Sequence, residues 1–561
     1  MIAKELLNPK SIAVIGASGD TQKPGGSILR NLLNSNFKGE VYTVNPKETE
    51  VQGVKCYQKV EDLPQVDCAI IAIAAKFCPA TVNTLAFEKG TKGFIIVSAG
   101  FSEENEQGAE FERQIVETVN KVGGSLIGPN CTGFLNRNYC GAFDSPIPTL
   151  DPHGVDFVTG SGATAVFIKE YGMTNGLTFN SVWAVGNSAQ VGIEDVLEHL
   201  DTTFDPETSS RVIMIYMEKI GNPQKLLKHS RSLINKGCRI AAIKSGGSAA
   251  GSRAASSHTG ALATDDSVVD ALFRKAGIVR CHNRQELTTV CAIFMHPEVK
   301  GKNVAVITHA GGPAVMLTDV LNSNGVEIPH ISGEKAEELL QKLFKGSSVS
   351  NPIDFLATGT PQQLDAILDA CENQFDVDAS VVIFGSPGLT DVYPAYEVLQ
   401  SRMKTSKKPI YPVLPSVINA GAAIEKFQAQ GGVSFNDEVS FGKAFVKVAN
   451  NINFPDAESF VDIDTSAIRN VIETSENGYL SPDKIQTLLD AAKINRVKEF
   501  VVNDPAQAEA VMKEISYPVV MKVIGPVHKT DVGGVALDVK DESSLAENFN
   551  RMIKIPHTTA I

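Results

Sequence analysis

One histidine, His258, lies in a run of small residues between Lys244 and Ala263, KSGGSAAGSRAASSHTGALA, with glycines on both sides of it. Such a segment has too little apolar surface to build a thick core, so it suits a loop that wraps closely around a ligand. An imidazole in that position can act as a nucleophile that accepts a phosphoryl group, a form of covalent catalysis. For the histidine alone, a surface loop with an incidental side chain is the simpler interpretation.

Two glycine turns elsewhere in the chain make the phosphoryl hypothesis stronger. Each turn is expected to lead into a helix, whose first N–H groups and positive dipole end attract anions. Two such ends facing one histidine would stabilise the negative charge of a phosphohistidine. The phosphate-cradling candidates are Ser161, Gly162 and Ala163 in the first turn, and Gly311 and Gly312 in the second. Alone, each turn is also explained as a structural connection.

A third glycine turn, Gly16–Gly19, follows the first apolar run and precedes a helix that starts near Pro24. It can hold an anionic phosphate, but the strict GxGxxG pattern of dinucleotide folds is missing. The next strand ends at Lys47, where NAD-binding folds usually carry an acidic residue. This cation suits an extra phosphate, although Glu48 directly follows it, so NAD is not excluded by the pattern.

Short β-branched runs that alternate with longer amphipathic stretches are expected to position these residues. Continuous apolar runs are typical of parallel strands covered on both faces. The first block predicts strands at 11–16, 40–45, 68–74, 93–100 and 125–130, with helices at 27–36, 82–89 and 104–122.

The same rhythm restarts twice. A second α/β block predicts strands at 155–160, 180–186, 211–218 and 239–246, and a third predicts strands at 303–308, 380–386 and 409–416. We expect linkers at 141–153 and 451–475. The final stretch predicts helices at 481–492 and 506–515, strands at 499–502 and 518–525, and a glycine hairpin at 532–539.

The composition excludes several classes of protein. The 561 residues suggest about four domains, and 43% hydrophobic with 20% charged residues is ordinary for a globular chain. A net charge of −13 argues against a general nucleic-acid binder. Nine cysteines without a CxxC indicate neither a zinc site nor a disulfide framework. The longest apolar run is too short to cross a bilayer, and no signal peptide is indicated, so we expect a soluble cytoplasmic protein.

At this point the sequence resembles the nucleoside-diphosphate-forming acyl-CoA synthetases, which include ADP-forming acetyl-CoA synthetases and succinyl-CoA synthetases. The resemblance covers essentially the whole chain, in the order of the fused members. Besides the histidine segment, its motifs are IAVIGAS with GEVYTVNPK, IIVSAGFSE at 95–103, IGPNCTG at 127–133, VITHAGGPAV at 306–315, NPIDF at 351–355 and YPVVMKVIGPVHKTDVGGV at 517–535.

This resemblance implies an α/β fold with four parts. They are a CoA-binding Rossmann-like domain at 1–140, a CoA-ligase domain with the phosphohistidine loop at 150–295, a second flavodoxin-like ligase domain at 300–455, and an incomplete ATP-grasp domain at 475–561. The last part is similar to the opening of an ATP-grasp unit, whose second lobe we expect to be missing.

The resemblance also implies roles for individual residues. His258 would be the phosphorylated nucleophile, and Glu218 would orient its ring. In the last domain, Lys522 would contact nucleotide phosphates and His528 would relay the phosphoryl group. The implied CoA-binding residues are Gly16, Ala17, Ser18, Lys47, Ser98, Gly100, Pro129 and Asn130.

The implied reaction converts acyl-CoA, ADP and phosphate reversibly into acid, CoA and ATP, through an acyl phosphate and a phosphohistidine. Coenzyme A, ATP or ADP and Mg²⁺ are the implied cofactors, and a small carboxylic acid and phosphate are the partners. A homodimer is expected, without nucleic-acid or membrane contacts. The chain departs from the family at Gly160, where a Gln or Arg is usual, and at His309, where an Asn is common. Two alternatives stay open: a non-catalytic CoA-binding regulatory relative and a Rossmann NAD(P) oxidoreductase.

Overall fold

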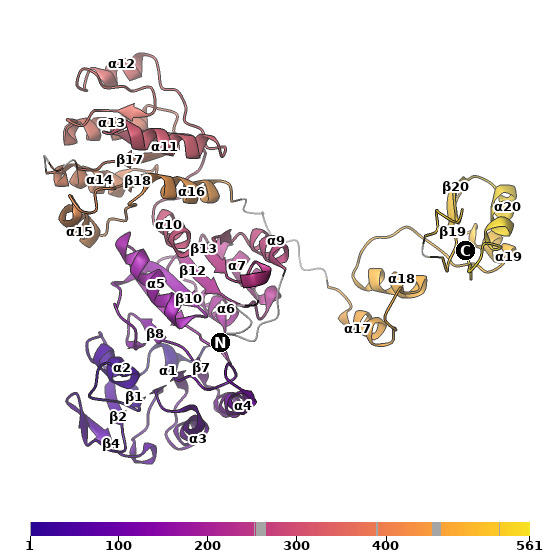
Figure 1. Ribbon diagram of the computed structural model, residues 1–561, viewed down its shortest axis with the longest axis horizontal. Coiled ribbons are helices and arrows are strands. Elements are labelled where there is room, and N and C mark those ends of the chain that lie inside the picture. The colour runs from indigo at the N-terminus through magenta and orange to yellow at the C-terminus, as the bar shows by residue number, and fades with distance from the viewer. Residues whose placement is uncertain are drawn as a thin grey trace. The chain divides into compact units, whose positions relative to one another are not determined.

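The computed structural model describes residues 2–251, 253, 265–386, 388, 391–451, 462–526 and 528–561. The chain divides into two compact units, Met1–Pro455 and Asp456–Ile561, and each is described by itself (Figure 1). His258 falls in a gap of the described ranges, so its predicted role stays a prediction.

The first sheet of unit 1 is almost entirely parallel, with the order β3-β4-β2-β1-β5-β6-β7. Every residue of β1, β5 and β6 is buried, as their continuous apolar sequences predict. Only the short β3 runs antiparallel to its neighbour β4. The strands are β1 Ser11–Ile15, β2 Glu40–Val44, β3 Glu50–Val51, β4 Val54–Tyr57, β5 Cys68–Ile71, β6 Gly93–Ile96 and β7 Ser125–Ile127. The helices around them are α1 Lys4–Leu7, α2 Pro24–Leu33, α3 Cys78–Glu88 and α4 Glu106–Lys121, with 3-10 turns at Val60–Asp62 and Ala75–Phe77.

The second sheet has the order β14-β13-β12-β10-β11-β8-β9. At one side of this sheet, β8 Gly133–Asn136 and the edge strand β9 Cys140–Ala142 run antiparallel to their neighbours, and both follow the first sheet in the chain. The expected linker at 141–153 is therefore partly strand. The other strands are β10 Leu150–Thr159, β11 Phe179–Ala184, β12 Val212–Met217, β13 Arg239–Lys244 and β14 Val279–Arg280. The helices are α5 Gly162–Thr174, α6 Ile193–Thr202, α7 Pro223–Asn235, α9 Asp266–Ala276 and α10 Arg284–Phe294.

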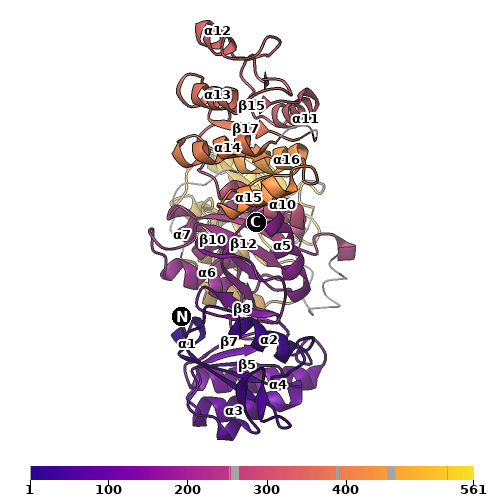
Figure 2. The same cartoon turned by 90° about the vertical axis from the view of Figure 1, so that its left-hand side faces the viewer.

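The third sheet is parallel, with the order β16-β15-β17-β18. It lies at the end of unit 1 opposite the first sheet, with the second sheet between them (Figures 1 and 2). Its strands are β15 Val304–Thr308, β16 Ile353–Asp354, β17 Ala379–Ile383 and β18 Ile410–Val413. Its helices are α11 Gly311–Asn322, α12 Glu334–Leu340, α13 Pro361–Asn373, α14 Tyr393–Thr405, α15 Gly421–Ala429 and α16 Glu438–Ala449.

Shared hydrophobic cores hold the three sheets of unit 1 together. One core joins Ile12 of β1 with Met217 of β12, and another joins Phe157 of β10 with Phe441 of α16. Buried apolar area of this kind is the main favourable term in such packing. These shared cores therefore fix the positions of the candidate site residues of unit 1 relative to one another.

Unit 2 is a small α/β fold around a two-stranded antiparallel sheet of β19 Val519–Lys522 and β20 Val535–Val539. Its helices are α17 Thr465–Glu473, α18 Pro482–Ala491, α19 Pro505–Val511 and α20 Glu542–Met552. The expected linker therefore contains a helix, α17. The strand expected at 499–502 is not formed, although the backbones of Val502 and Ile561 exchange two hydrogen bonds of 2.9 and 3.0 Å. In the described parts of the chain, no helix is long and apolar enough to span a membrane.

A buried carboxyl group on β10 provides a test of this fold by pH. Asp156 is 2% exposed, and its Oδ1 accepts hydrogen bonds from Ser181 Oγ at 2.5 Å and Asn180 Nδ2 at 2.8 Å. Burial raises the pKa of Asp156 to about 6, although these two hydrogen bonds lower it. A carboxyl group whose folded pKa is raised stabilises the protein at low pH, and this stabilisation is lost as the pH rises through about 6.

We therefore expect that the free energy of unfolding of Asp156→Asn falls less between pH 4 and pH 8 than that of the wild type. At pH 8 the variant should be more stable than the wild type by about 3 kcal/mol, because the amide carries no charge that must be buried. Thermal and urea unfolding at several pH values measure the effect, with the exposed Asp62→Asn as control. An unchanged pH slope in Asp156→Asn would contradict the expectation.

Candidate active site

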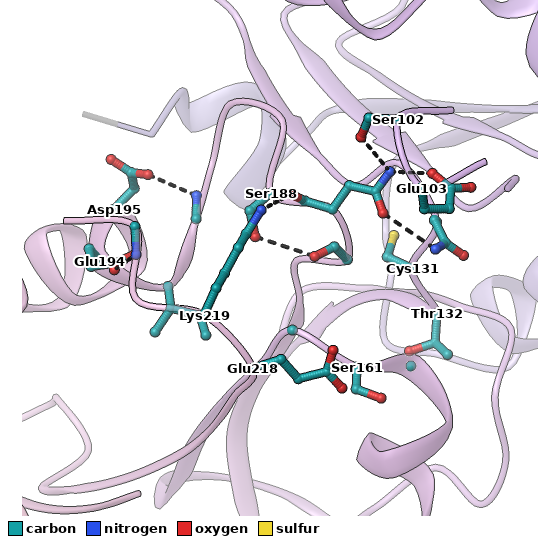
Figure 3. A pocket seen from close by; sticks show the side chains of 18 of the residues that line it. Ser102, Glu103, Cys131, Thr132, Ser161, Ser188, Glu194, Asp195, Glu218 and Lys219 are labelled. Carbon is teal, nitrogen blue, oxygen red and sulfur yellow. Dashed lines mark hydrogen bonds between the residues drawn. The ribbon is translucent and has the colours of Figure 1, made fainter. Parts of the chain in front are cut away.

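A cavity of about 850 Å³ opens in unit 1 where loops of the first and second sheets meet. Side chains from both sheets line it, and Figure 3 shows them converging from several loops. Strand ends and helix starts meet here, which is where open α/β sheets bind their ligands. Of the residues predicted from sequence, the cavity brings together Asn130, Ser161, Gly162, Ala163 and Glu218.

The start of helix α5 forms one wall of the cavity. Ser161 is the N-cap residue, and its hydroxyl donates to Thr164 Oγ1 at 2.9 Å rather than capping a backbone N–H group. The first N–H groups of the helix are thus left for a ligand, together with the positive end of the dipole. Gly162 is required by space, because a Cβ atom there would lie 2.8 Å from Thr132 Cγ2. The predicted helix start is confirmed.

Glu218 directly follows strand β12 and lines the same cavity. In Figure 3 its carboxylate lies beside Ser161, at the mouth of helix α5. Tyr216 Oη donates to Glu218 Oε1 over 3.5 Å, which is a weak contact. A carboxylate here can accept a hydrogen bond from one ring nitrogen of a histidine and so fix its tautomer.

The opposite wall is a polar network between the two sheets. Asn130 Nδ2 donates to Asn187 Oδ1 at 3.3 Å, and Asn187 Nδ2 donates to Glu103 Oε2 at 2.5 Å. Glu103 Oε1 in turn accepts from the backbone N–H of Gly100 at 2.7 Å. Although burial raises the pKa of Glu103, the hydrogen bonds from Asn187 and the backbone lower it below its ordinary value. The carboxylate stays charged and ties the loop after β6 to the loop after β11.

Close backbone contact strengthens this junction. The N–H of Asn187 donates to Pro129 O at 3.0 Å, and a Cβ atom at Gly186 would lie 2.3 Å from that same oxygen. Lys219, the residue after Glu218, donates to Asn187 O at 3.1 Å. The segment at Pro129–Asn130 is therefore held in a fixed position relative to Glu218.

The predicted CoA-binding residues lie at the carboxyl ends of parallel strands in the first sheet. Gly16, Ala17 and Ser18 follow β1, and Lys47 follows β2 as an exposed cation. Further along the sheet, Ser98 and Gly100 follow β6, and Pro129 and Asn130 follow β7. Asn130 donates its backbone N–H to Ser98 O at 2.9 Å, which links the last two loops. Among these residues, Asn130 lines the cavity and the others do not.

The second glycine turn also begins a helix, as predicted, since α11 starts at Gly311. Gly311 and Gly312 are exposed, and neither lines the 850 Å³ cavity. The neighbouring His309 stacks on Phe384, with ring centroids 4.4 Å apart, and burial lowers its pKa. That both helix ends face His258 stays a prediction, because His258 lies outside the described residues.

Lys522 and His528 lie in unit 2. Lys522 ends strand β19, His528 lies in the turn that follows, and both side chains are exposed. Their predicted roles toward a nucleotide stay predictions. The described residues contain no group of three or more His, Cys, Asp or Glu side chains that could hold a metal ion.

Sequence reasoning did not identify several residues of the cavity. Glu103 stands inside the motif IIVSAGFSE, and Asn187 follows strand β11 in a segment that carried no recognised motif. Lys219 adjoins Glu218 in sequence. Glu103 and Asn187 are hydrogen-bonded to each other but lie far apart along the chain, so no local pattern could have paired them. The other polar residues that line the cavity are Ser102, Thr132, Ser188, Glu194, Asp195, Asn222 and Lys225.

Three family models match successive parts of the chain. A CoA binding domain matches residues 10–137, a succinyl-CoA ligase like flavodoxin domain matches residues 152–294, and an ATP-grasp domain matches residues 471–560. The first range contains the whole first sheet, the second contains most of the second sheet, and the third lies within unit 2.

Individual proteins are similar over long stretches. The acetate–CoA ligase [ADP-forming] I of Archaeoglobus fulgidus is 31% identical, over 97% of this chain and 79% of that protein. The subunit alpha of acetate–CoA ligase [ADP-forming] II from Pyrococcus furiosus is 31% identical, over 79% of this chain and 97% of the subunit. Among solved structures, dinucleotide forming acetyl-coenzyme A synthetase 1 of Ca. Korarchaeum cryptofilum, in complex with phosphate and ADP, aligns with a TM-score of 0.71 and 27% identity. That alignment covers 79% of this chain and 96% of the other.

Proposed function

The chain belongs to the ADP-forming acyl-CoA synthetases, and from this membership we propose that it couples the thioester of a small acyl-CoA to ATP formation through a phosphorylated His258. It is an acid–thiol ligase that uses coenzyme A and ADP or ATP. We propose a short carboxylic acid as the substrate, since the relatives reported above act on acetate by name.

The observation that carries the proposal is the geometry of the 850 Å³ cavity. It brings the helix start at Ser161–Ala163 and the carboxylate of Glu218 into one space with Asn130, from the loop after β7 of the CoA-binding sheet. An anion, a histidine and a thioester could meet there. A Rossmann oxidoreductase needs none of these groups together, and the family membership removes that alternative.

The chemistry proceeds in three displacements. A phosphate oxygen attacks the thioester carbonyl, so that a C–O bond forms, the C–S bond breaks and coenzyme A leaves as a thiol after protonation. The ring nitrogen of His258 then attacks the phosphorus of the acyl phosphate, and the carboxylate leaves. Finally a β-phosphate oxygen of ADP takes the phosphoryl group from His258, which returns to its neutral form.

The residues of the chain position these steps. The free N–H groups of α5 hold the phosphate oxygens, and Glu218 orients the imidazole by accepting its second N–H. The network of Glu103, Asn187 and Asn130 holds the loop that we expect to carry the thioester end of coenzyme A. In unit 2, Lys522 and His528 would serve the nucleotide.

We also propose the four domains at 1–140, 150–295, 300–455 and 475–561, and a homodimer. Mg²⁺ would accompany the nucleotide phosphates, which usually supply most of its ligands together with one or two carboxylates. Bound with the nucleotide, it would neutralise charge during phosphoryl transfer. Light scattering in solution would test the dimer.

Incubation of the wild-type protein with acetyl-CoA and radiolabelled phosphate, without nucleotide, should label the protein covalently. In Glu218→Gln we expect the rate of labelling to fall by about 100-fold, because an amide oxygen orients the ring and stabilises its positive charge less well than a carboxylate. Rapid-quench measurements of the label give the rate, and Glu207→Gln, at an exposed turn that does not line the cavity, is the control.

A labelling rate in Glu218→Gln equal to that of the wild type would remove Glu218 from the mechanism. Absence of label in the wild type, together with tight binding of coenzyme A, would favour the non-catalytic CoA-binding alternative.

A further inference from the structure

A second cavity, of about 640 Å³, lies at the carboxyl end of strand β13, next to α5 and α10. None of the described residues that line it also lines the 850 Å³ cavity, although residues from the first two turns of helix α5 line both. The residues that matter below are Lys244, Gly246, Gly247, Arg280 and Arg284, which all line it.

Lys244 is the unusual residue of this second cavity. Its side chain ends strand β13 and is only 8% exposed. No residue in the described ranges forms a hydrogen bond or an ion pair with its ammonium group. The side chain is largely buried, but its ammonium group is not one of the fully buried atoms, so it is accessible from the cavity. Its placement in a cavity indicates that the partner is an anionic ligand.

The loop after Lys244 supplies further donors. The backbone N–H groups of Gly246 and Gly247 line the cavity and make no hydrogen bond with any described residue. Successive free N–H groups in a loop form a favourable concavity for anions. They stand beside the lysine in sequence, and a ligand that satisfies the lysine can also satisfy them.

The other charges of the cavity leave a net positive site. The carboxylates of Asp266 and Asp270 are both bound by Arg280, at 2.5 Å each. Arg284 has no ion-pair partner within the described structure and stacks over Phe167, with 5.7 Å between guanidinium and ring centroid. After these pairings, Lys244 and Arg284 remain as uncompensated cations among the described residues that line the cavity.

We propose that this second cavity binds a phosphoryl oxyanion, held by the ammonium of Lys244, the loop N–H groups and Arg284. A tetrahedral dianion offers three acceptor oxygens, which matches donors that come from several directions, whereas a carboxylate offers two in one plane. Free phosphate and the terminal phosphates of a nucleotide share this chemistry. The site lies beside the segment that contains His258 in sequence, and it is separate from the phosphate cradle at Ser161.

Equilibrium dialysis of the full chain with radiolabelled inorganic phosphate tests the proposal. We expect two phosphates per wild-type chain, one in Lys244→Met, one in Ser161→Asp and none in the double variant. An aspartate at the N-cap favours the helix while it repels a phosphate, so Ser161→Asp should stay folded. The exposed Lys228→Met on α7 is the control and should keep both phosphates.

The outcomes separate this proposal from the proposed function. Two phosphates bound by Lys244→Met would overturn the second site and leave the cradle intact. If the wild type binds one phosphate and Ser161→Asp binds none, the second site is also overturned and the cradle stands. If Lys244→Met loses one phosphate and Ser161→Asp loses none, the second site stands and the cradle at Ser161 fails.

Two further measurements test whether Lys244 and Arg284 themselves bind the second phosphate. Phosphate should raise the Tm of Lys244→Met less than it raises the Tm of the wild type, because the variant has lost one of the two phosphate sites. Arg284→Gln, at an exposed position, should weaken the Lys244-dependent affinity by about tenfold. An unchanged affinity in Arg284→Gln, with an unchanged phosphate effect on Tm in Lys244→Met, would overturn the site.

Competition identifies the source of the oxyanion. If pyrophosphate displaces the Lys244-dependent phosphate at a much lower concentration than phosphate does, the site supports binding of a nucleotide end. Equal displacement supports free phosphate as the occupant. Displacement by acetate at the same concentration would overturn the phosphoryl assignment, because the site would then accept any carboxylate.

Discussion

His258→Ala is expected to abolish covalent labelling by acetyl-CoA and radiolabelled phosphate, and to lower ATP formation by at least about 1,000-fold. The alanine has no nitrogen to accept the phosphoryl group, so the reaction would stop at the acyl phosphate. The half-reaction before it should continue, and acyl phosphate would be released into solution. Trapping of this product with hydroxylamine measures it directly.

Two matched variants make the result specific. His330→Ala changes an exposed histidine between α11 and α12 and should leave the label unchanged. His528→Ala should keep the label at His258 but block its discharge to ADP, because His528 is predicted to act after that step. Undiminished label in His258→Ala would mean that another residue accepts the phosphoryl group.

Local sequence patterns predicted the strands and helices of unit 1 well, because each strand is a short continuous apolar run. The first four residues of the run CAIIAIA became β5, all four of them buried, and the glycine turn after VDFVTG became the start of α5. Hydrophobicity and turn chemistry act over a few residues, so they can be read without knowledge of the fold.

The strand pairings that the sequence patterns did not predict have a physical explanation as well. Strand β8 joins the second sheet, although it follows the first sheet closely in sequence, because its pairing with β11 is a long-range choice. Of the expected strand at 499–502, Val502 exchanges two backbone hydrogen bonds with Ile561, which lies far from it along the chain. Neither contact can be recognised from the local hydrophobic periodicity of the sequence.

Of the residues predicted to be catalytic, Glu218 lines the candidate site, whereas the residues that hold its loops in place were not predicted. Glu218 could be found because it belongs to a resemblance, while Asn187 and Glu103 meet across 84 positions and have no common motif. The unpaired state of Lys244 was equally hidden, because its burial depends on the helices around β13. Positioning and electrostatics are properties of the assembled fold.

One such assembled contact anchors the helix that forms the candidate phosphate cradle. Lys169 of α5 is 0% exposed, and its ammonium is hydrogen-bonded to the carboxylate of Asp144, which is also buried. Its other contact is Pro146 O at 3.5 Å. The second carboxylate oxygen of Asp144 is buried with no partner in the described structure. The pair therefore ties α5 to the chain that leads into β10.

Lys169→Met is expected to lower the free energy of unfolding by about 3–5 kcal/mol, because it leaves the carboxylate of Asp144 buried without a counter-charge. The double variant Lys169→Met with Asp144→Leu should recover most of this loss, since no charge then remains to be buried. Denaturant unfolding of the full chain gives the values, and Arg113→Met, in an exposed ion pair, should leave Tm unchanged. A single variant within 1 kcal/mol of the wild type would mean that Asp144 is protonated or hydrated. Because α5 carries Ser161 and Gly162, the single variant should also slow labelling of His258, and the double variant should restore both properties together.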